Sequence, residues 1–223
     1  MVEYSMTVDA LQRNIRSVAA RIAAAGDGVT LVAATKTVPA ELVNAAIDFG
    51  VTDIGENRVQ EYLEKRDAVK PAKSHFIGTL QRNKAKYLVG NIELIQSVNS
   101  IELAEEISRL ATKRGVDQRV LIEVNAAGEA TKTGASKAEF DAILRAAEGL
   151  PGITVCGMMS VPPKGAGDEV YRELYEMFNA NRGGAFDILS VGMSGDFEKA
   201  IGFGSNMVRI GSAIFGERQP ITK

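Results

Sequence analysis

The sequence is poor in residues that bind metals or cross-link chains: its 223 residues include one cysteine, one histidine and no tryptophan. A single cysteine, Cys156, excludes an intramolecular disulfide and any site built from several cysteines. It lies in the apolar run 153–159, where we expect a small buried thiol. The single histidine, His75, stands near the start of a predicted strand, which favours a structural, hydrogen-bonding role. We therefore expect no metal site.

An excess of charge of one sign and a long apolar run are also absent. Lysine and arginine number 26 and aspartate and glutamate 28, a formal net charge of −2, which leaves no electrostatic footprint for nucleic acid. No apolar stretch approaches the roughly 20 residues needed to cross a bilayer. The first residues lack the basic and apolar regions of a secretory signal. We expect a cytoplasmic protein with neither a nucleic-acid nor a membrane partner.

What the sequence does have is a regular alternation of short β-rich runs and helical segments. A first helix is expected over about residues 7–26, because apolar residues recur there every three to five positions. Eight β-rich runs follow, at residues 30–35, 51–55, 75–78, 94–98, 120–125, 153–159, 188–192 and 207–210. Short β-branched runs that alternate with helices favour a parallel sheet buried on both faces.

Eight such runs predict a (β/α)8 TIM barrel, an α/β fold, with an extra N-terminal helix and a single domain over residues 1–223. An open, doubly wound sheet is the alternative fold. The sequence lacks a Gly-x-Gly-x-x-Gly fingerprint after the first run and a phosphate-binding Gly-x-x-x-x-Gly-Lys-Ser/Thr loop. These absences favour the barrel.

The first β-rich run leads into a lysine, Lys36, directly after the apolar residues 31–34. The carboxyl ends of barrel strands form the mouth where sites lie, so we expect the Lys36 amine at the edge of a low-dielectric core. Partial desolvation favours a neutral lysine amine, the form that attacks an aldehyde to give a Schiff base. The alternative is a lysine whose side chain only extends into solvent.

Two turns of small residues, 193–195 and 210–212, follow the seventh and eighth runs. Small residues let backbone N–H groups approach an anion, and serine hydroxyls add donors. The loops after strands seven and eight of a barrel frequently form a phosphate site, although the glycines could also serve the turns alone. A phosphate site there would face Lys36 across the mouth, so the implied ligand is a phosphorylated aldehyde.

Five ordered blocks carry a family resemblance: TKTVP at 35–39, GENRVQE at 55–61, HFIGTLQRNK at 75–84, GMSGDFEKAI at 192–201 and VRIGSAIFG at 208–216. With them the sequence resembles the pyridoxal 5′-phosphate (PLP) homeostasis proteins over essentially its whole length. The resemblance implies a PLP barrel of fold type III, similar to that of alanine racemase. It also implies a protein of vitamin B6 homeostasis that holds PLP as an internal aldimine without established catalytic turnover.

The resemblance also assigns cofactor contacts, residue by residue, and no catalytic residue. Lys36 matches the Schiff-base lysine, Arg209 matches the arginine that faces the pyridine nitrogen, and Asn57 lies in the Gly-Glu-Asn block near the ring. The phosphate-binding positions are matched by Ser194, Gly211 and Ser212. Small departures from the family pattern at residues 35, 191 and 206 touch none of these contacts.

An arginine opposite the pyridine nitrogen argues for a binding protein rather than an enzyme. An acidic partner keeps the ring protonated and makes it an electron sink, whereas an arginine is always charged and accepts no proton. The racemase relatives also need a second domain that supplies a tyrosine base, for which 223 residues leave no room. We expect a monomer that buffers or delivers the cofactor, with transient contacts to the apo-enzymes that receive it.

Other functions remain open. One is a PLP-dependent, racemase-like enzyme, and another is a Schiff-base aldolase that uses Lys36 without a cofactor and needs an acid or base beside it. Glu56 and Glu123 are the nearest candidates for that group by sequence position. A third alternative, an interaction scaffold without a ligand, conflicts with the intact lysine and serines. Lys132, in the loop after the fifth run, is either a solvated charge or a second amine that accepts the cofactor.

Overall fold

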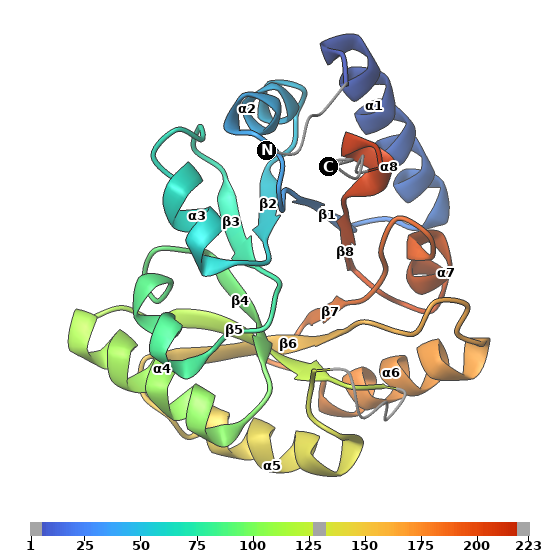
Figure 1. Cartoon of the computed structure of the whole chain (residues 1–223). Coiled ribbons are helices and arrows are strands. Elements are labelled where there is room, and N and C mark those ends of the chain that lie inside the picture. The colour runs from blue at the N-terminus through green and yellow to red at the C-terminus, as the bar shows by residue number, and fades with distance from the viewer. Residues whose placement is uncertain (1–5, 127–132, 218–223) are drawn as a thin grey trace, which may run out of the picture.

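The protein, described by a computed structural model over residues 6–126 and 133–217, forms a closed ring of eight parallel strands. The strands are β1 (Thr30–Ala34), β2 (Asp53–Glu56), β3 (Lys73–Phe76), β4 (Leu94–Val98), β5 (Gln118–Val124), β6 (Ile153–Ser160), β7 (Ile188–Ser190) and β8 (Met207–Ile210). Each strand pairs with the next in sequence, and β8 closes the ring on β1 (Figure 1). The predicted (β/α)8 barrel is confirmed, and the open sheet is excluded.

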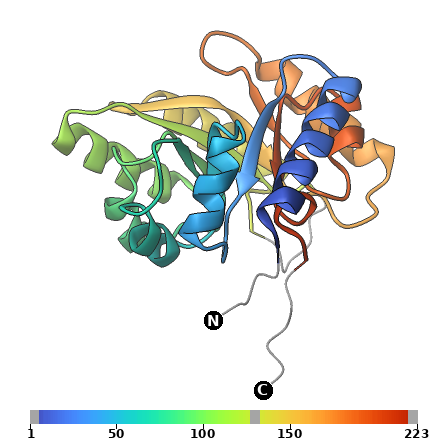
Figure 2. The ribbon, with the colours of Figure 1, turned by 90° about the horizontal axis from the view of Figure 1, so that it is seen from above.

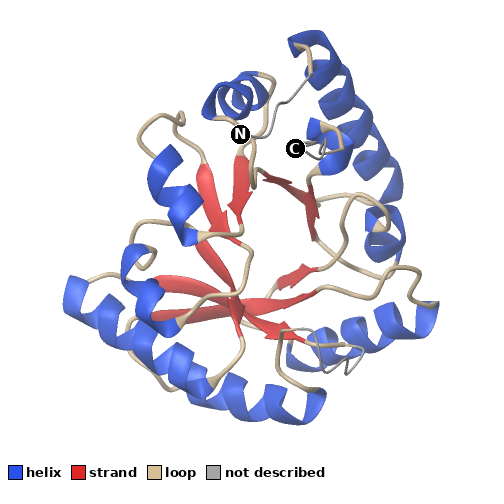
Figure 3. Ribbon diagram, viewed as in Figure 1, coloured by secondary structure: helices blue, strands red, loops and turns tan. Residues whose placement is uncertain are grey.

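Helices surround the ring of strands on its outside (Figure 3). They are α1 (Val8–Ala25), α2 (Ala40–Asp48), α3 (Val59–Lys65), the 3₁₀ helix η1 (Arg82–Tyr87), α4 (Ile101–Arg114), α5 (Lys137–Glu148), α6 (Asp168–Asn181), α7 (Phe197–Gly202) and α8 (Ser212–Phe215). The short α8, which the sequence did not predict, begins at the end of the turn predicted at residues 210–212. None of the helices in the two described ranges is long and apolar enough to cross a membrane.

The predicted N-terminal helix, α1, is present and covers the barrel beside its last two helices. Thr7 caps the helix by accepting a hydrogen bond from the backbone of Ala10 at 3.2 Å. Its buried face consists of Leu11, Ile15, Val18 and Ile22. The Asn14 side chain donates to the carbonyl of Ile214 at 3.0 Å, and both views show α1 next to α8 (Figures 1 and 2). The helix therefore ties the start of the described chain to its end.

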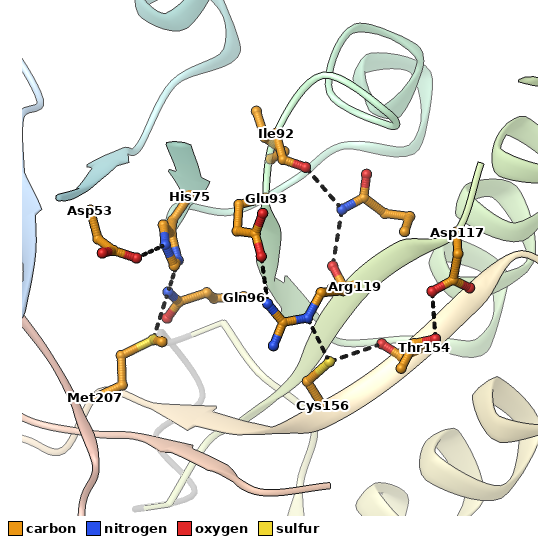
Figure 4. Close-up of polar contacts among 11 residues, drawn as sticks. Asp53, His75, Ile92, Glu93, Gln96, Asp117, Arg119, Thr154, Cys156 and Met207 are labelled. Atoms are coloured by element: carbon orange, nitrogen blue, oxygen red, sulfur yellow. Dashed lines mark hydrogen bonds and ion pairs between the residues drawn. The ribbon is translucent and has the colours of Figure 1, made fainter. Parts of the chain in front are cut away.

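The interior of the ring is packed with side chains, as expected for eight strands. Its apolar cluster consists of Val32, Leu94, Leu121, Cys156, Met159 and Met207. The single cysteine is thus buried, as the sequence predicted. Burial raises the pKa of the Cys156 thiol, although the Nε–H of Arg119, which donates to the sulfur at 3.3 Å (Figure 4), opposes this. The thiol is a packing group rather than a nucleophile.

A bulge in β6 lets two residues three positions apart both face this interior. The pairing of β5 with β6 shifts register between Val120 and Leu121. Gly157 has a φ of 146°, and a Cβ on it would lie 1.9 Å from the carbonyl oxygen of Ile188, so glycine is required. A regular strand has a side-chain period of two. The bulge therefore explains how Cys156 and Met159 join one cluster.

Candidate functional site

A cavity of about 720 Å³ lies at the carboxyl ends of β1 and β8, the end of a barrel where sites form. Five of the six residues predicted to contact the ligand line it: Lys36, Ser194, Arg209, Gly211 and Ser212. The sixth, Asn57, is not part of this lining. Its side-chain oxygen is buried and has no hydrogen-bond partner among the described residues.

The loop after β6 also contributes to the cavity, which the sequence interpretation missed. Pro162, Pro163 and Lys164 of this loop lie in the lining. The rule that loops after strands surround the mouth would have found them, had it been applied to the sixth β-rich run. The cavity thus contains a second lysine besides Lys36.

The backbone around Lys36 is held by helix α3. Lys65 donates from its Nζ to the carbonyl of Thr35 at 2.8 Å, and the backbone N–H of Thr37 donates to Glu61 Oε2 at 2.8 Å. Thr37 has a φ of 64°, a left-handed conformation that is strained for a β-branched residue and persists only where its surroundings enforce it. Lys36 therefore lies in a turn whose conformation is held by side chains of α3.

Glu56, at the end of β2, supports the same turn. Its Oε1 accepts a hydrogen bond from Thr35 Oγ1 at 2.6 Å and lies 2.5 Å from Lys65 Nζ. Burial raises the pKa of Glu56, and the neighbouring Lys65 and Thr35 oppose that rise. Glu56 is absent from the cavity lining. The structure therefore gives no support to Glu56 as the acid–base partner of an aldolase.

Glu123, the second candidate acid, is also absent from the cavity lining. Its Oε1 accepts a hydrogen bond from Thr133 Oγ1 at 2.7 Å. Burial raises the pKa of Glu123, and the bond from Thr133 and the charge of Arg209 oppose the rise. Neither acid thus lies where the aldolase hypothesis needs one. Lys132, the candidate second amine, lies outside the described residues.

The two small-residue turns after β7 and β8 meet each other, and their two serines and two glycines line one wall of the cavity. Ser194 Oγ accepts a hydrogen bond from the backbone N–H of Ala213 at 3.2 Å. Asp196 fixes the first turn, because its Oδ1 accepts from the Met193 N–H and its Oδ2 from the Tyr171 hydroxyl, both at 2.7 Å. Apart from Met193, the two turns present hydroxyls and backbone to the cavity, which suits an anion.

Arg209, on β8, reaches the cavity from the barrel interior, and only 4% of its surface is exposed. Its Nη1 donates to the carbonyl of Ser190 at 2.7 Å and to Ser190 Oγ at 2.6 Å, and its Nη2 donates to the carbonyl of Ser160 at 2.8 Å. Burial lowers the pKa of Arg209 to about 10, against the opposing charges of Glu123 and Asp196. The guanidinium is therefore still protonated at neutral pH.

A larger cavity, of about 830 Å³, opens at the amino ends of the strands. Asp53, His75 and Arg119 are among the residues that line it, but none of the six predicted site residues does. His75 lies 2.9 Å from Asp53 and 3.0 Å from Gln96 (Figure 4), which confirms its predicted hydrogen-bonding role. The mouth, where the predicted residues converge, is the candidate site.

Residues 6–219 match the family model of the alanine racemase N-terminal domain. The pyridoxal phosphate homeostasis protein of Aquifex aeolicus is 42% identical over 198 residues, which make up 85% of this chain and 87% of that relative.

Solved structures show the same barrel. PipY of Synechococcus elongatus, in a structure with PLP bound, superposes with a TM-score of 0.80 at 27% identity and covers 92% of this chain and 100% of PipY. An alanine racemase from Clostridium difficile superposes with a TM-score of 0.75 at 16% identity, and the match covers 94% of this chain but 58% of the racemase. The likeness to the racemase concerns the fold alone.

Proposed function

The chain belongs to the pyridoxal phosphate homeostasis proteins, whose barrel is that of the alanine racemase N-terminal domain, and we propose that it binds PLP at the mouth and buffers or delivers it. When bound, PLP supplies an aldehyde that reacts with amines and a ring that withdraws electrons. The observation that carries this proposal is the convergence of Lys36, two serines and Arg209 on a single cavity of about 720 Å³.

The residues of the cavity fit this group. Its volume lies within the range of small-molecule sites. The hydroxyls of Ser194 and Ser212 and the backbone at Gly211 are the donors that a phosphate requires, and Lys36 is the amine that an aldehyde requires. Lys36 would hold the cofactor through its aldehyde, the serine turns would bind its phosphate, and Arg209 would lie on the side of its ring nitrogen. Asn57 stays a prediction, since it lies outside the lining.

Arg209 supports a binding role rather than catalysis. Its guanidinium is a donor that cannot take up a proton, and it remains charged at neutral pH because its pKa is about 10. Such a group would hold a neighbouring ring nitrogen unprotonated, which would weaken the electron withdrawal that amino-acid chemistry needs. The protein accordingly acts as a monomeric cytoplasmic carrier, with transient contacts to the apo-enzymes that receive PLP.

The test is to add PLP to the purified protein, record the visible spectrum, reduce with borohydride and map the modified peptide. The proposal expects a yellow protein and a label on Lys36, with neither in Lys36→Ala. A protein that stays colourless would overturn PLP binding and leave the cofactor-free aldolase to be tested with sugar phosphates. Steady conversion of L-alanine to D-alanine by the loaded protein would overturn the carrier role in favour of a racemase-like enzyme.

Delivery has its own experiment. The loaded protein is mixed with a PLP-dependent apo-enzyme, either in one compartment or across a dialysis membrane that passes free PLP. Faster activation in the shared compartment supports direct transfer. Equal rates would show that the protein only releases PLP into solution.

A further inference from the structure

A chain of four hydrogen bonds crosses the barrel interior from the mouth to the base. Arg209 Nη1 lies 2.6 Å from Ser190 Oγ, and Ser190 Oγ lies 2.7 Å from Gln96 Oε1. Gln96 Nε2 lies 3.0 Å from His75 Nδ1, and His75 Nε2 lies 2.9 Å from Asp53 Oδ1 (Figure 4 shows this lower part). All five residues are at least 95% buried. They come from β8, β7, β4, β3 and β2, so the chain connects non-adjacent strands across the ring.

The chemistry at the two ends of the chain fixes every hydrogen in it. A guanidinium only donates, so Ser190 Oγ accepts from Arg209, and the Ser190 hydroxyl donates its own hydrogen to Gln96 Oε1. Gln96 therefore turns its oxygen toward Ser190 and its NH₂ toward His75. The Nδ1 atom of His75 must then accept, which leaves the ring hydrogen on Nε2, where it donates to Asp53.

Asp53 is an acceptor at the far end. Burial acts to raise the pKa of its carboxyl, but the bonds from His75 and Thr52 outweigh burial and bring the pKa below its ordinary value. The second hydrogen of the Gln96 amide is also engaged, since Nε2 lies 3.3 Å from the sulfur of Met207. The amide of Gln96 thus has one orientation that satisfies all its neighbours.

We propose that Ser190, Gln96 and His75 are positioning residues for the cofactor: together they hold the Arg209 guanidinium in place for the ring nitrogen of PLP. The inference rests on the proposed function, because it takes PLP as the ligand that Arg209 faces. Two of the three bonds that hold the Arg209 side chain end on Ser190. The orientation of the Ser190 hydroxyl in turn depends on Gln96, and that of Gln96 on the tautomer of His75.

An apolar filling would be the simpler way to pack this space, and the same interior uses one elsewhere: Val32, Leu121 and Met159 fill it without polar atoms. Burying five polar groups costs free energy unless every one of them is hydrogen bonded. A continuous chain that ends on Arg209, an arginine of the cavity lining, therefore indicates a role in placing that arginine.

The first test uses the protein without PLP, so its outcome is independent of the proposed function. Because His75 is the only histidine, ¹⁵N–¹H correlation spectra of its ring contain a single set of signals. The chain requires a protonated Nε2 and an unprotonated Nδ1. In Gln96→Glu the new carboxylate only accepts, so both ring nitrogens should be protonated. A wild-type ring protonated on Nδ1, or unchanged ring signals in Gln96→Glu, would overturn the inference.

The second test adds PLP. Ser190→Ala should weaken PLP binding roughly 5- to 100-fold, the range expected when a buried donor loses its partner. The matched control is Ser205→Ala, a serine that is also buried but whose hydroxyl bonds only to backbone groups of residues 189, 191 and 207. The control should change PLP binding by less than about 3-fold.

Saturation with PLP should also shift the His75 ring signals of the wild-type protein, and this shift should disappear in Ser190→Ala saturated with PLP. If wild-type protein binds PLP but Ser190→Ala binds it equally well and transmits the same shift, the inference fails while the proposed function stands. If wild-type protein binds no PLP, the proposed function fails, and the spectrum of the PLP-free protein still decides whether the hydrogen-bond chain exists.

Discussion

The Lys65 ammonium and the Glu56 carboxylate form an ion pair with a distance of 2.5 Å beside the turn that carries Lys36. Both side chains are largely buried, with 16% and 7% of their surface exposed. The same ammonium donates to the carbonyl of Thr35, so helix α3 is joined both to the end of β2 and to the turn after β1. The pair thus links the stability of the barrel to the geometry of the proposed cofactor lysine.

We predict that Lys65→Met destabilises the protein by about 3–5 kcal/mol, because removing one partner leaves a buried carboxylate without compensation. Urea unfolding followed by circular dichroism measures this change. The double variant with Glu56→Gln and Lys65→Met should recover much of the loss, since it buries no net charge. A loss below about 1 kcal/mol in the single variant, the value typical of a surface pair, would contradict this account.

Glu123 should limit stability at neutral pH. Burial raises the pKa of its carboxyl in the folded state, so the folded protein binds this proton more readily than the unfolded chain does. The contribution of this carboxyl to the free energy of unfolding is therefore fully present below its pKa in the unfolded chain, which is about 4.3. The contribution is lost as the pH rises from that value through the higher pKa of the folded state. Glu123→Gln keeps an acceptor for Thr133 but removes the charge.

The variant Glu123→Gln should accordingly unfold at a higher urea concentration than the wild-type protein at pH 7, with a smaller difference near pH 4. Unfolding midpoints at both pH values are the measurement. A variant less stable than wild type at pH 7 would mean that the attraction between Glu123 and Arg209 outweighs the cost of burying the carboxylate.

Gly157→Ala should unfold the barrel or destabilise it by about 3 kcal/mol or more, since its Cβ would meet the Ile188 carbonyl oxygen at 1.9 Å and its φ is 146°. Gly183→Ala is the matched control, because nothing lies within 4 Å of its Cβ and its φ is not positive. Thermal unfolding of both variants compares them. Equal melting temperatures would show that the bulge in β6 adapts to a side chain.

The bulge also shows where sequence patterns stop being informative. The alternation of β-rich and helical segments predicted all eight strands, because most residues of these runs are buried. The positions of Lys36 and the serine turns at strand ends predicted that they lie together at the mouth, because parallel strands bring their carboxyl ends together. By contrast, the sequence pattern does not predict that Cys156 and Met159 face the same interior. That placement depends on a register shift, which arises only when β6 pairs with β5.

The hydrogen-bond chain inside the barrel lay beyond prediction for a related reason. Gln96, Ser190 and Asp53 are ordinary polar residues in the sequence, and their relation exists only once the ring closes and places β2, β4 and β7 around one interior. Asn57 is a related case. Its sequence block predicts a position near the ring, and its side chain is absent from the cavity lining, so its contact with the cofactor stays a prediction.

The wall of small residues leads to a prediction that separates recognition of the phosphate from recognition of the ring. Ser194 is proposed to donate to the phosphate, and its Oγ also joins the turn after β7 to α8 by accepting from Ala213. Ser194→Ala should therefore weaken PLP binding by roughly tenfold, as expected for the loss of a charge-assisted hydrogen bond. Pyridoxal, which has the aldehyde and ring but lacks the phosphate, should bind the variant and the wild-type protein equally.

Absorbance titrations with both compounds make this comparison, and inorganic phosphate should compete with PLP in the wild-type protein more strongly than in Ser194→Ala. Lys36→Ala provides the opposite control, because it should abolish the yellow colour with both compounds while still binding inorganic phosphate, which calorimetry measures. If Ser194→Ala weakened the binding of PLP and of pyridoxal to the same extent, the serine would act on the shape of the whole mouth. The phosphate would then be bound elsewhere in the lining, where Lys164 is one of the cations among the described residues.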